Sequence, residues 1–193
     1  MRGIYLIRHG NTTYDTKVDA LLNPPLDREG VERIERTVKF LEKENLRFSR
    51  IISSPLQRAL RVAEMISHGD TRVTTNNGAL PWNLGDLMGK EARQVKDKME
   101  YLKNYPDIKA PHGESYRRFY LRWQDFLQKV MAYVEAKDEA VCITTHSRNI
   151  NALQSIIGGN PVGDVQEITP EASVTFLAKT GLDWKYIMIW DGR

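Results

Sequence analysis

Three short stretches of the sequence carry side chains that could bind and attack an anion. The first is Arg8-His9-Gly10, which directly follows four apolar residues, Ile4 to Ile7. The second is Ser53-Ser54-Pro55 with Arg58 one helical turn later, and the third is His146-Ser147, which follows another apolar run. A neutral histidine is a nucleophile, arginine forms charge-assisted bonds to anions, and glycine lets an anion approach backbone N–H groups. These residue types are typical of a phosphate-binding and phosphate-transferring site.

The elements around these stretches should bring them together. Apolar runs predict buried strands, and apolar residues at helical spacing predict helices, in the order strand 4–7, helix 27–45, strand 48–53, helix 55–66, strand 140–145 and helix 147–157. This rhythm favours a mainly parallel sheet, whose strands end at one common edge where ligands bind. Arg58 would lie at the positive end of its helix, a position that a bound anion would explain.

The remaining segments complete the predicted fold. They are a weak strand at 72–75, an irregular loop at 80–89, helices at 91–102 and 116–136, and two last strands at 173–177 and 184–189 joined by a tight turn. We therefore expect a three-layer α/β/α sandwich with a mainly parallel six-stranded sheet and one antiparallel edge strand. Residues 1–193 are expected to form a single domain.

Composition excludes several classes of protein. The formal charge of +3 is small and the basic residues are dispersed, so no nucleic-acid partner is expected. No signal-peptide pattern and no apolar span of about 20 residues is found, so no membrane partner is expected. Cys142 is alone, lies in an apolar run and favours a reducing, cytoplasmic setting. No group of Asp, Glu, Cys and His has metal-ligand spacing, which predicts a site without metal or cofactor.

These motifs, in this order, resemble those of the histidine phosphatase superfamily, which contains the cofactor-dependent phosphoglycerate mutases. Arg8-His9-Gly10 matches the signature of that superfamily, and residues 53–59 match its second arginine motif almost residue for residue. Further landmarks follow in the same order at residues 25–30, 85–89, 113–115 and 144–146. The resemblance spans the chain and implies a phosphoglycerate mutase-like fold.

The resemblance also implies roles for the catalytic residues. His9 would carry the phosphoryl group as a phosphohistidine, and Arg8, Arg58 and His146 would contact the phosphoryl oxygens. The expected substrate contacts are Gly10, Asn11, Trp82 and Ser147. For Trp82 the alternatives are a wall of the substrate site or a pin for its own loop. Arg148 either extends the positive field toward a second anionic group or lies on a helix surface.

The sequence departs from the family pattern at the proton donor. If Gly85 and Gly89 align with the glycine pair of the family, Pro81 occupies the position at which many members have a catalytic glutamate. Met88 likewise replaces a second glutamate, and neither side chain transfers a proton. We expect either another carboxyl, with Glu114 placed among the catalytic residues and Asp86 as the alternative, or a substrate that needs no acid.

The expected function is metal-independent hydrolysis of phosphoric monoesters, with a phosphorylated small molecule or a phosphoprotein as substrate. One alternative is a mutase of the same superfamily, although such mutases are typically longer. The other is a non-catalytic module that binds a phosphorylated ligand or a protein, against which the intact Arg8, His9, Arg58 and His146 argue. The identity of the substrate and the oligomeric state are open at this point.

Overall fold

The computed structural model describes residues 2–14, 17–19, 21–67, 69–162 and 169–193. Its centre is a six-stranded sheet with the strand order β3-β2-β4-β1-β5-β6. The strands are β1 (Gly3–Arg8), β2 (Arg50–Ser53), β3 (Val73–Thr75), β4 (Ala140–Thr145), β5 (Val174–Thr180) and β6 (Asp183–Trp190). The helices are α1 (Arg28–Lys43), α2 (Gln57–Ser67), α3 (Ala92–Asn104), α4 (Tyr116–Lys137), α5 (Ser147–Asn151) and α6 (Leu153–Ile156), with 3-10 turns η1 (Asn77–Ala79) and η2 (Gly85–Leu87).

The strand directions confirm the expected fold class. Strands β1 to β4 are mutually parallel, whereas β5 runs antiparallel to β1 and forms an antiparallel pair with β6 at the edge of the sheet. The strand of opposite direction is thus β5, one position in from the edge. The hairpin turn expected between the last two strands lies between Thr180 and Asp183.

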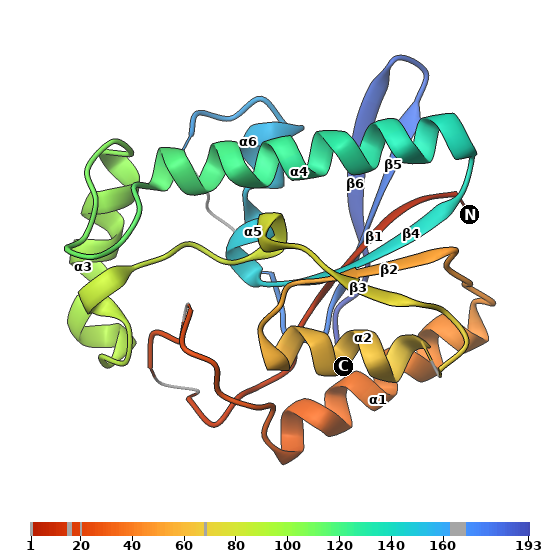
Figure 1. Cartoon of the computed structure of the whole chain (residues 1–193), viewed down its shortest axis with the longest axis horizontal. Coiled ribbons are helices and arrows are strands. Elements are labelled where there is room, and N and C mark those ends of the chain that lie inside the picture. Colours follow the sequence, from red (N-terminus) through yellow and green to blue (C-terminus); the bar gives the residue numbers. More distant parts are fainter. Residues whose placement is uncertain (1, 15–16, 20, 68, 163–168) are drawn as a thin grey trace.

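Helices cover both faces of the sheet and make three layers (Figure 1). Alternate residues of β1 point to opposite faces, as the two-residue period of a strand requires. Ile4 and Leu6 pack into the core beneath α4, and Tyr5 and Ile7 pack into the core beneath α1 and α2. All four side chains are fully buried, which makes β1 the centre of the molecule.

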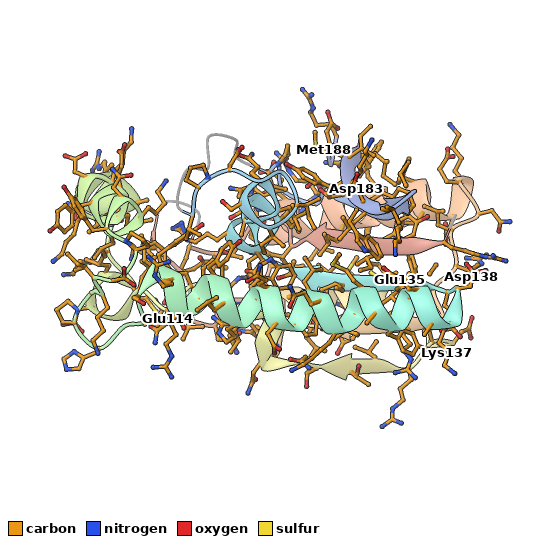
Figure 2. All side chains as sticks on the ribbon, turned by 90° about the horizontal axis from the view of Figure 1, so that it is seen from above. Glu114, Glu135, Lys137, Asp138, Asp183 and Met188 are labelled. Carbon is orange, nitrogen blue, oxygen red and sulfur yellow. The ribbon has the colours of Figure 1, made fainter. Side chains whose placement is uncertain are left out.

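The caps of the long helices agree with the sequence. Asp27 accepts a hydrogen bond from the Gly30 N–H at 2.6 Å and starts α1, as expected for an N-cap aspartate. Ser115 starts α4 in the same way, and Asp138, in the left-handed region at φ 56°, ends it. Figure 2 shows Glu114 and Asp138 at opposite ends of α4.

Two helices differ from the prediction. Helix α2 begins at Gln57, two residues beyond the expected first turn at Pro55. The helix expected at 147–157 is divided into α5 and α6 at Ala152. Within this segment, Asn149 donates to the Leu80 carbonyl and Asn151 accepts from the Thr169 N–H. Both asparagine side chains thus tie the segment to loops that are distant in the sequence.

Cys142 lies on β4 and is fully buried, as expected, and burial raises the pKa of its thiol. Within the described ranges, no helix has both the length and the apolar character needed to span a bilayer. The cytoplasmic location stays a prediction.

Candidate active site

The carboxyl ends of the central strands open onto a cavity of about 180 Å³. Figure 1 shows α5 directly beyond the end of β4 at this edge. The cavity is lined by Arg8, His9, Gly10, Asn11, Thr12, Tyr14, Lys17, Asp19, Arg58, Pro81, His146, Ser147, Arg148 and Glu171. The structure therefore brings together seven of the nine residues that the sequence analysis placed in the site.

His9 is held as a neutral nucleophile. Its ring Nδ1 lies 2.7 Å from the Gly10 carbonyl oxygen, so Nδ1 carries the hydrogen and donates it. The other nitrogen, Nε2, accepts a hydrogen bond from Nε of Arg58 at 3.3 Å. Burial, and then the charges of Arg58 and Arg8, lower the pKa of His9 well below 6.5. Nε2 is therefore unprotonated at neutral pH, and its lone pair points toward Arg58.

Arg58 is almost fully buried beside His9, near the start of α2. Its Nη1 donates to the Leu22 carbonyl at 2.8 Å, and its Nε lies 3.2 Å from a carboxylate oxygen of Asp19. The sequence predicts a bound anion beside Arg58, and in the structure the carboxylate of Asp19 also lies beside it. Asp19 follows no periodic pattern in its polar loop, so nothing in the local sequence points to it.

Arg8 forms the second side of the anion pocket. Its Nη2 donates to Glu171 at 3.1 Å, and its Nη1 donates to the Thr169 carbonyl. Glu171 also lies 4.0 Å from Arg33 of α1, and it is the second pocket residue that the sequence analysis missed. Burial lowers the pKa of Arg8, while the charges of Glu171 and Asp19 raise it.

His146 faces His9 across the cavity, with ring centroids 5.1 Å apart in an edge-on arrangement. Its Nε2 lies 2.9 Å from the Ser54 hydroxyl oxygen, at the end of β2. Burial lowers the pKa of His146 well below 6.5, and the charges of Arg58 and Arg8 lower it further. The two histidines thus come from the ends of neighbouring parallel strands, as expected.

Three buried polar atoms at this cavity have no hydrogen-bond partner among the described residues: Nε of Arg8, Nδ1 of His146 and Oδ1 of Asn11. Buried polar atoms almost always have partners, because leaving one unpaired costs about 1–3 kcal/mol. The unpaired nitrogens of Arg8 and His146 can donate to a tetrahedral anion, whose oxygens accept hydrogen bonds in several directions, whereas Oδ1 of Asn11 is an acceptor. The cavity is therefore suited to a phosphoryl group.

A pair of glycines fixes the position of the loop after β1, which lines the cavity. A Cβ on Gly10 would lie 2.4 Å from the Gly30 carbonyl oxygen, and a Cβ on Gly30 would lie 2.2 Å from the Asn11 carbonyl oxygen. The loop after β1 therefore packs directly on the first turn of α1. Gly10 acts through this close backbone approach, which no side chain permits.

Two residues expected at the site lie elsewhere. Neither Glu114 nor Trp82 lines the cavity. The Glu114 carboxylate lies 2.8 Å from Nη2 of Arg122 and accepts a hydrogen bond from the Asn83 N–H at 3.0 Å. Trp82 is fully buried, and its Nε1 donates to the Glu114 carbonyl at 3.0 Å. These contacts correct the catalytic role expected for Glu114. Trp82 stabilises its own loop and does not line the cavity.

Neither of the two positions at which a glutamate was expected brings a carboxyl to the cavity. Pro81 lines the cavity, and Met88 packs against the apolar core beneath α4. Asp86 does not line the cavity; it is half exposed and pairs with His112 at 2.9 Å. Among the residues that the structure describes, the carboxylates that line it are those of Asp19 and Glu171, and each is paired with an arginine.

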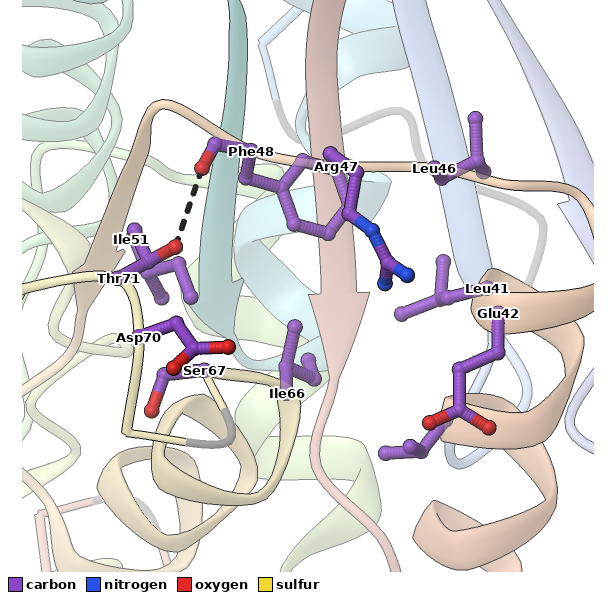
Figure 3. Close-up of a pocket in the computed structure, with 11 residues that line it drawn as sticks. Leu41, Glu42, Leu46, Arg47, Phe48, Ile51, Ile66, Ser67, Asp70 and Thr71 are labelled. Carbon is purple, nitrogen blue, oxygen red and sulfur yellow. Dashed lines mark hydrogen bonds between the residues drawn. The ribbon is translucent and has the colours of Figure 1, made fainter.

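A larger cavity, of about 350 Å³, lies at the amino ends of the parallel strands (Figure 3). Its floor is apolar and includes Leu41, Ile51 and Ile66, and the Thr71 hydroxyl donates to the Phe48 carbonyl at its side. It lies at the end of the sheet opposite to His9. Among the described residues, no three His, Cys, Asp or Glu side chains gather as a metal site.

Comparison with known proteins agrees with this geometry. The model of the histidine phosphatase superfamily (branch 1) matches residues 4–190. A Bacillus subtilis (strain 168) protein named "Uncharacterized phosphatase PhoE" is 29% identical over 166 residues, which cover 83% of this chain and 80% of that protein. A 2,3-bisphosphoglycerate-dependent phosphoglycerate mutase of Bartonella bacilliformis is 26% identical over 170 residues, which cover 82% of each chain.

Solved structures show the same fold. A mycobacterial glucosyl-3-phosphoglycerate phosphatase, solved in complex with VO3, superposes with a TM-score of 0.82 at 22% identity over 99% of both chains. The phosphoglycerate mutase of Bacillus anthracis superposes with a TM-score of 0.85 at 16% identity over 99% of this chain and 93% of that one. The shared architecture includes phosphatases and mutases alike.

Proposed function

The chain belongs to the histidine phosphatase superfamily, and we propose that it is a phosphatase that hydrolyses phosphoric monoesters through a phosphohistidine on His9, without a metal ion. The observation that carries the proposal is the His9 ring, whose Nδ1 is fixed by the Gly10 carbonyl while Nε2 faces Arg58 in the cavity. This orientation supports attack by Nε2 on phosphorus.

The reaction proceeds in two displacements. In the first, Nε2 of His9 forms a bond to phosphorus, and the bond from phosphorus to the ester oxygen breaks and releases the alcohol or its anion. In the second, water attacks the phosphohistidine, the N–P bond breaks, and inorganic phosphate leaves neutral His9. Arg8, Arg58 and His146 hold the equatorial oxygens, whose negative charge must be stabilised in both transition states.

A mutase is the second candidate, because several of the similar proteins carry that name. A mutase returns the phosphoryl group from His9 to a second substrate molecule, whereas a phosphatase gives it to water. The two functions therefore share the first displacement and differ only in the acceptor of the second. The small cavity, which opens to solvent, supports water as the acceptor.

The test begins with purified protein, a chelator and p-nitrophenyl phosphate. We expect steady release of phosphate, and an acid-labile, alkali-stable label on the protein after brief exposure to a radioactive phosphoryl donor. His9→Ala should lose the label and at least roughly 10³-fold in kcat, as nucleophile removals do. His112→Ala is the matched control, since the side chain of His112 is 84% exposed.

The outcomes separate the candidates. Label that persists in His9→Ala would reject the nucleophile. Faster transfer between phosphoglycerates than hydrolysis of any monoester would favour the mutase. Binding of phosphate without label or turnover would favour the non-catalytic module.

A further inference from the structure

Arg148 lines the same cavity as His9, but its side chain is positioned by α5 and the ring of Trp82. It is the second residue of α5, and its guanidinium carbon lies 5.9 Å from the centroid of the Trp82 ring. The Trp82 ring is itself fully buried and fixed by its hydrogen bond to the Glu114 carbonyl. The guanidinium of Arg148 is therefore supported by a rigid aromatic surface next to Pro81.

The pairing of Arg148 differs from that of the other cavity arginines. Arg8 has Glu171 and Arg58 has Asp19 as a carboxylate partner. Within the part of the chain that the structure describes, Arg148 has neither a hydrogen bond nor an ion pair, and its contact is the indole of Trp82. Burial lowers the pKa of Arg148, and the carboxylate whose charge raises it is that of Asp19, which is already paired with Arg58. A partly buried arginine without a bonded acid of its own is suited to an acid brought by a ligand.

Arg148 also stands apart from the phosphoryl-binding group. The arginines whose charges lower the pKa of His9 are Arg58 and Arg8. Arg148 is not among them, and the charges that act on the pKa of Arg148 include those of Asp19 and Arg8. The exposed Lys17, whose Nζ lies 5.6 Å from the Tyr14 ring centroid, adds positive charge to the same cavity. Arg148 and Lys17 thus add positive charge to the cavity beyond that of Arg8 and Arg58.

We infer that Arg148 is a specificity-determining residue that binds a second acidic group of the substrate, a carboxylate or a second phosphate, while Arg8, Arg58 and His146 hold the phosphoryl group. This inference rests on the proposed function and names its substrate class. The cavity of about 180 Å³ has room for the volume of about six water molecules. It is smaller than the roughly 300 Å³ at the lower end of common ligand sites, which favours a small phosphorylated acid.

The experiment uses phosphonates, which the enzyme cannot hydrolyse, so that binding is read without turnover. Calorimetry compares 3-phosphonopropionate with propylphosphonate, which has the same chain length but no carboxylate. The wild type should prefer the carboxylate by about tenfold or more, as expected for a charge-assisted bond to a partly buried arginine. In Arg148→Gln the ratio of the two affinities should fall to within about threefold of one.

The controls keep every result interpretable. Arg28→Gln, whose side chain is 93% exposed, should keep the wild-type ratio. Thermal unfolding checks that Arg148→Gln is folded, and Arg148→Lys should keep part of the preference, because it retains the charge but loses the planar fork. Propane-1,3-bisphosphonate is the third ligand; tighter binding than 3-phosphonopropionate would identify a second phosphate rather than a carboxylate as the acidic group.

Two results would overturn the inference. The first is equal affinity of the wild type for 3-phosphonopropionate and propylphosphonate. The second is a preference for the carboxylate that survives in Arg148→Gln. Either result would show that Arg148 does not bind an acidic group of the substrate. The proposed function would stand in either case. If no phosphonate or phosphate binds to the wild type, the phosphoryl pocket itself is wrong, and both proposals fall together.

Discussion

Two regions of the molecule are built around buried or partly buried arginines, and their hydrogen bonding differs. Arg122 of α4 donates to the carbonyl oxygens of four residues, Asn77, Gly78, Leu80 and Pro81, and pairs with Glu114. In the cavity, by contrast, Arg8 keeps an unpaired Nε, and His146 nearby keeps an unpaired Nδ1 among the described residues. An arginine whose bonds go to its own chain organises the fold, whereas one with a spare donor is available to a ligand.

The two regions are also coupled. Arg122 holds the Pro81 carbonyl at 3.2 Å, and Pro81 lines the cavity. The next residue, Trp82, supports Arg148 and is bonded to the Glu114 carbonyl. The Arg122 region therefore shapes one wall of the site without contributing a reacting group.

The largest expected effect concerns the missing proton donor. Because Pro81 cannot donate a proton, aryl phosphates should be hydrolysed roughly 10²–10⁴ times faster than alkyl phosphates, which is the usual worth of general acid catalysis. Steady-state kinetics on a series of leaving groups measures this slope in the wild type, Asp19→Asn and Glu114→Gln. If the wild type shows no slope and Glu114→Gln becomes steep, Glu114 is the acid after all, and the contrast between the two regions fails.

The second-largest effect is expected on the kcat of an Arg58 variant. Arg58→Ala should lower kcat by roughly 10²–10³, as other losses of a charge-stabilising donor do, and should weaken vanadate binding. The matched control is Arg61→Ala in the same helix, whose side chain is 58% exposed and pairs with Glu64. Equal kinetics of both variants would mean that Arg58 is structural, like Arg122.

Glu114→Ala tests the other region. It leaves Arg122 and the Asn83 N–H without their carboxylate, which should lower the free energy of unfolding by about 1–3 kcal/mol. The effect on kcat for p-nitrophenyl phosphate should be smaller than that of Arg58→Ala. Urea unfolding and kinetics on the same preparations compare the two; a loss of kcat without a loss of stability would contradict the structural role.

The smallest effect is a pH dependence of stability that the two cavity histidines should cause between pH 7.5 and 5.5. His9 and His146 are buried with pKa values well below 6.5, so the unfolded chain binds more protons than the folded chain at acidic pH. Stability from these two groups is complete above pH 6.5 and falls as pH decreases, by about 1.4 kcal/mol per pH unit for each histidine. Urea unfolding at pH 7.5 and 5.5 should show a smaller difference in His9→Asn than in the wild type.

The sequence predicts the strands and the strand-end motifs well because their signals are local. Ile4 to Ile7 and the residues after them form one continuous pattern, and strand β4 has the predicted bounds. Asp19 and Glu171 were missed because irregular loops bring them to Arg58 and Arg8, and no spacing encodes that approach. Glu114 was misplaced because a motif before a helix does not say that its carboxylate turns toward Arg122.

The position of β1 has a consequence for how activity appears during synthesis. Ile4 pairs with Val141 on one side and with Leu177 on the other, so the first strand is completed by segments made much later. During synthesis His9 is made early, whereas His146 follows β4 and Glu171 is made later still. Such long-range pairing is slow to form, and a truncated chain that ends before β4 cannot assemble the site. Recovery of enzymatic activity is therefore a readout of completed folding of the whole sheet.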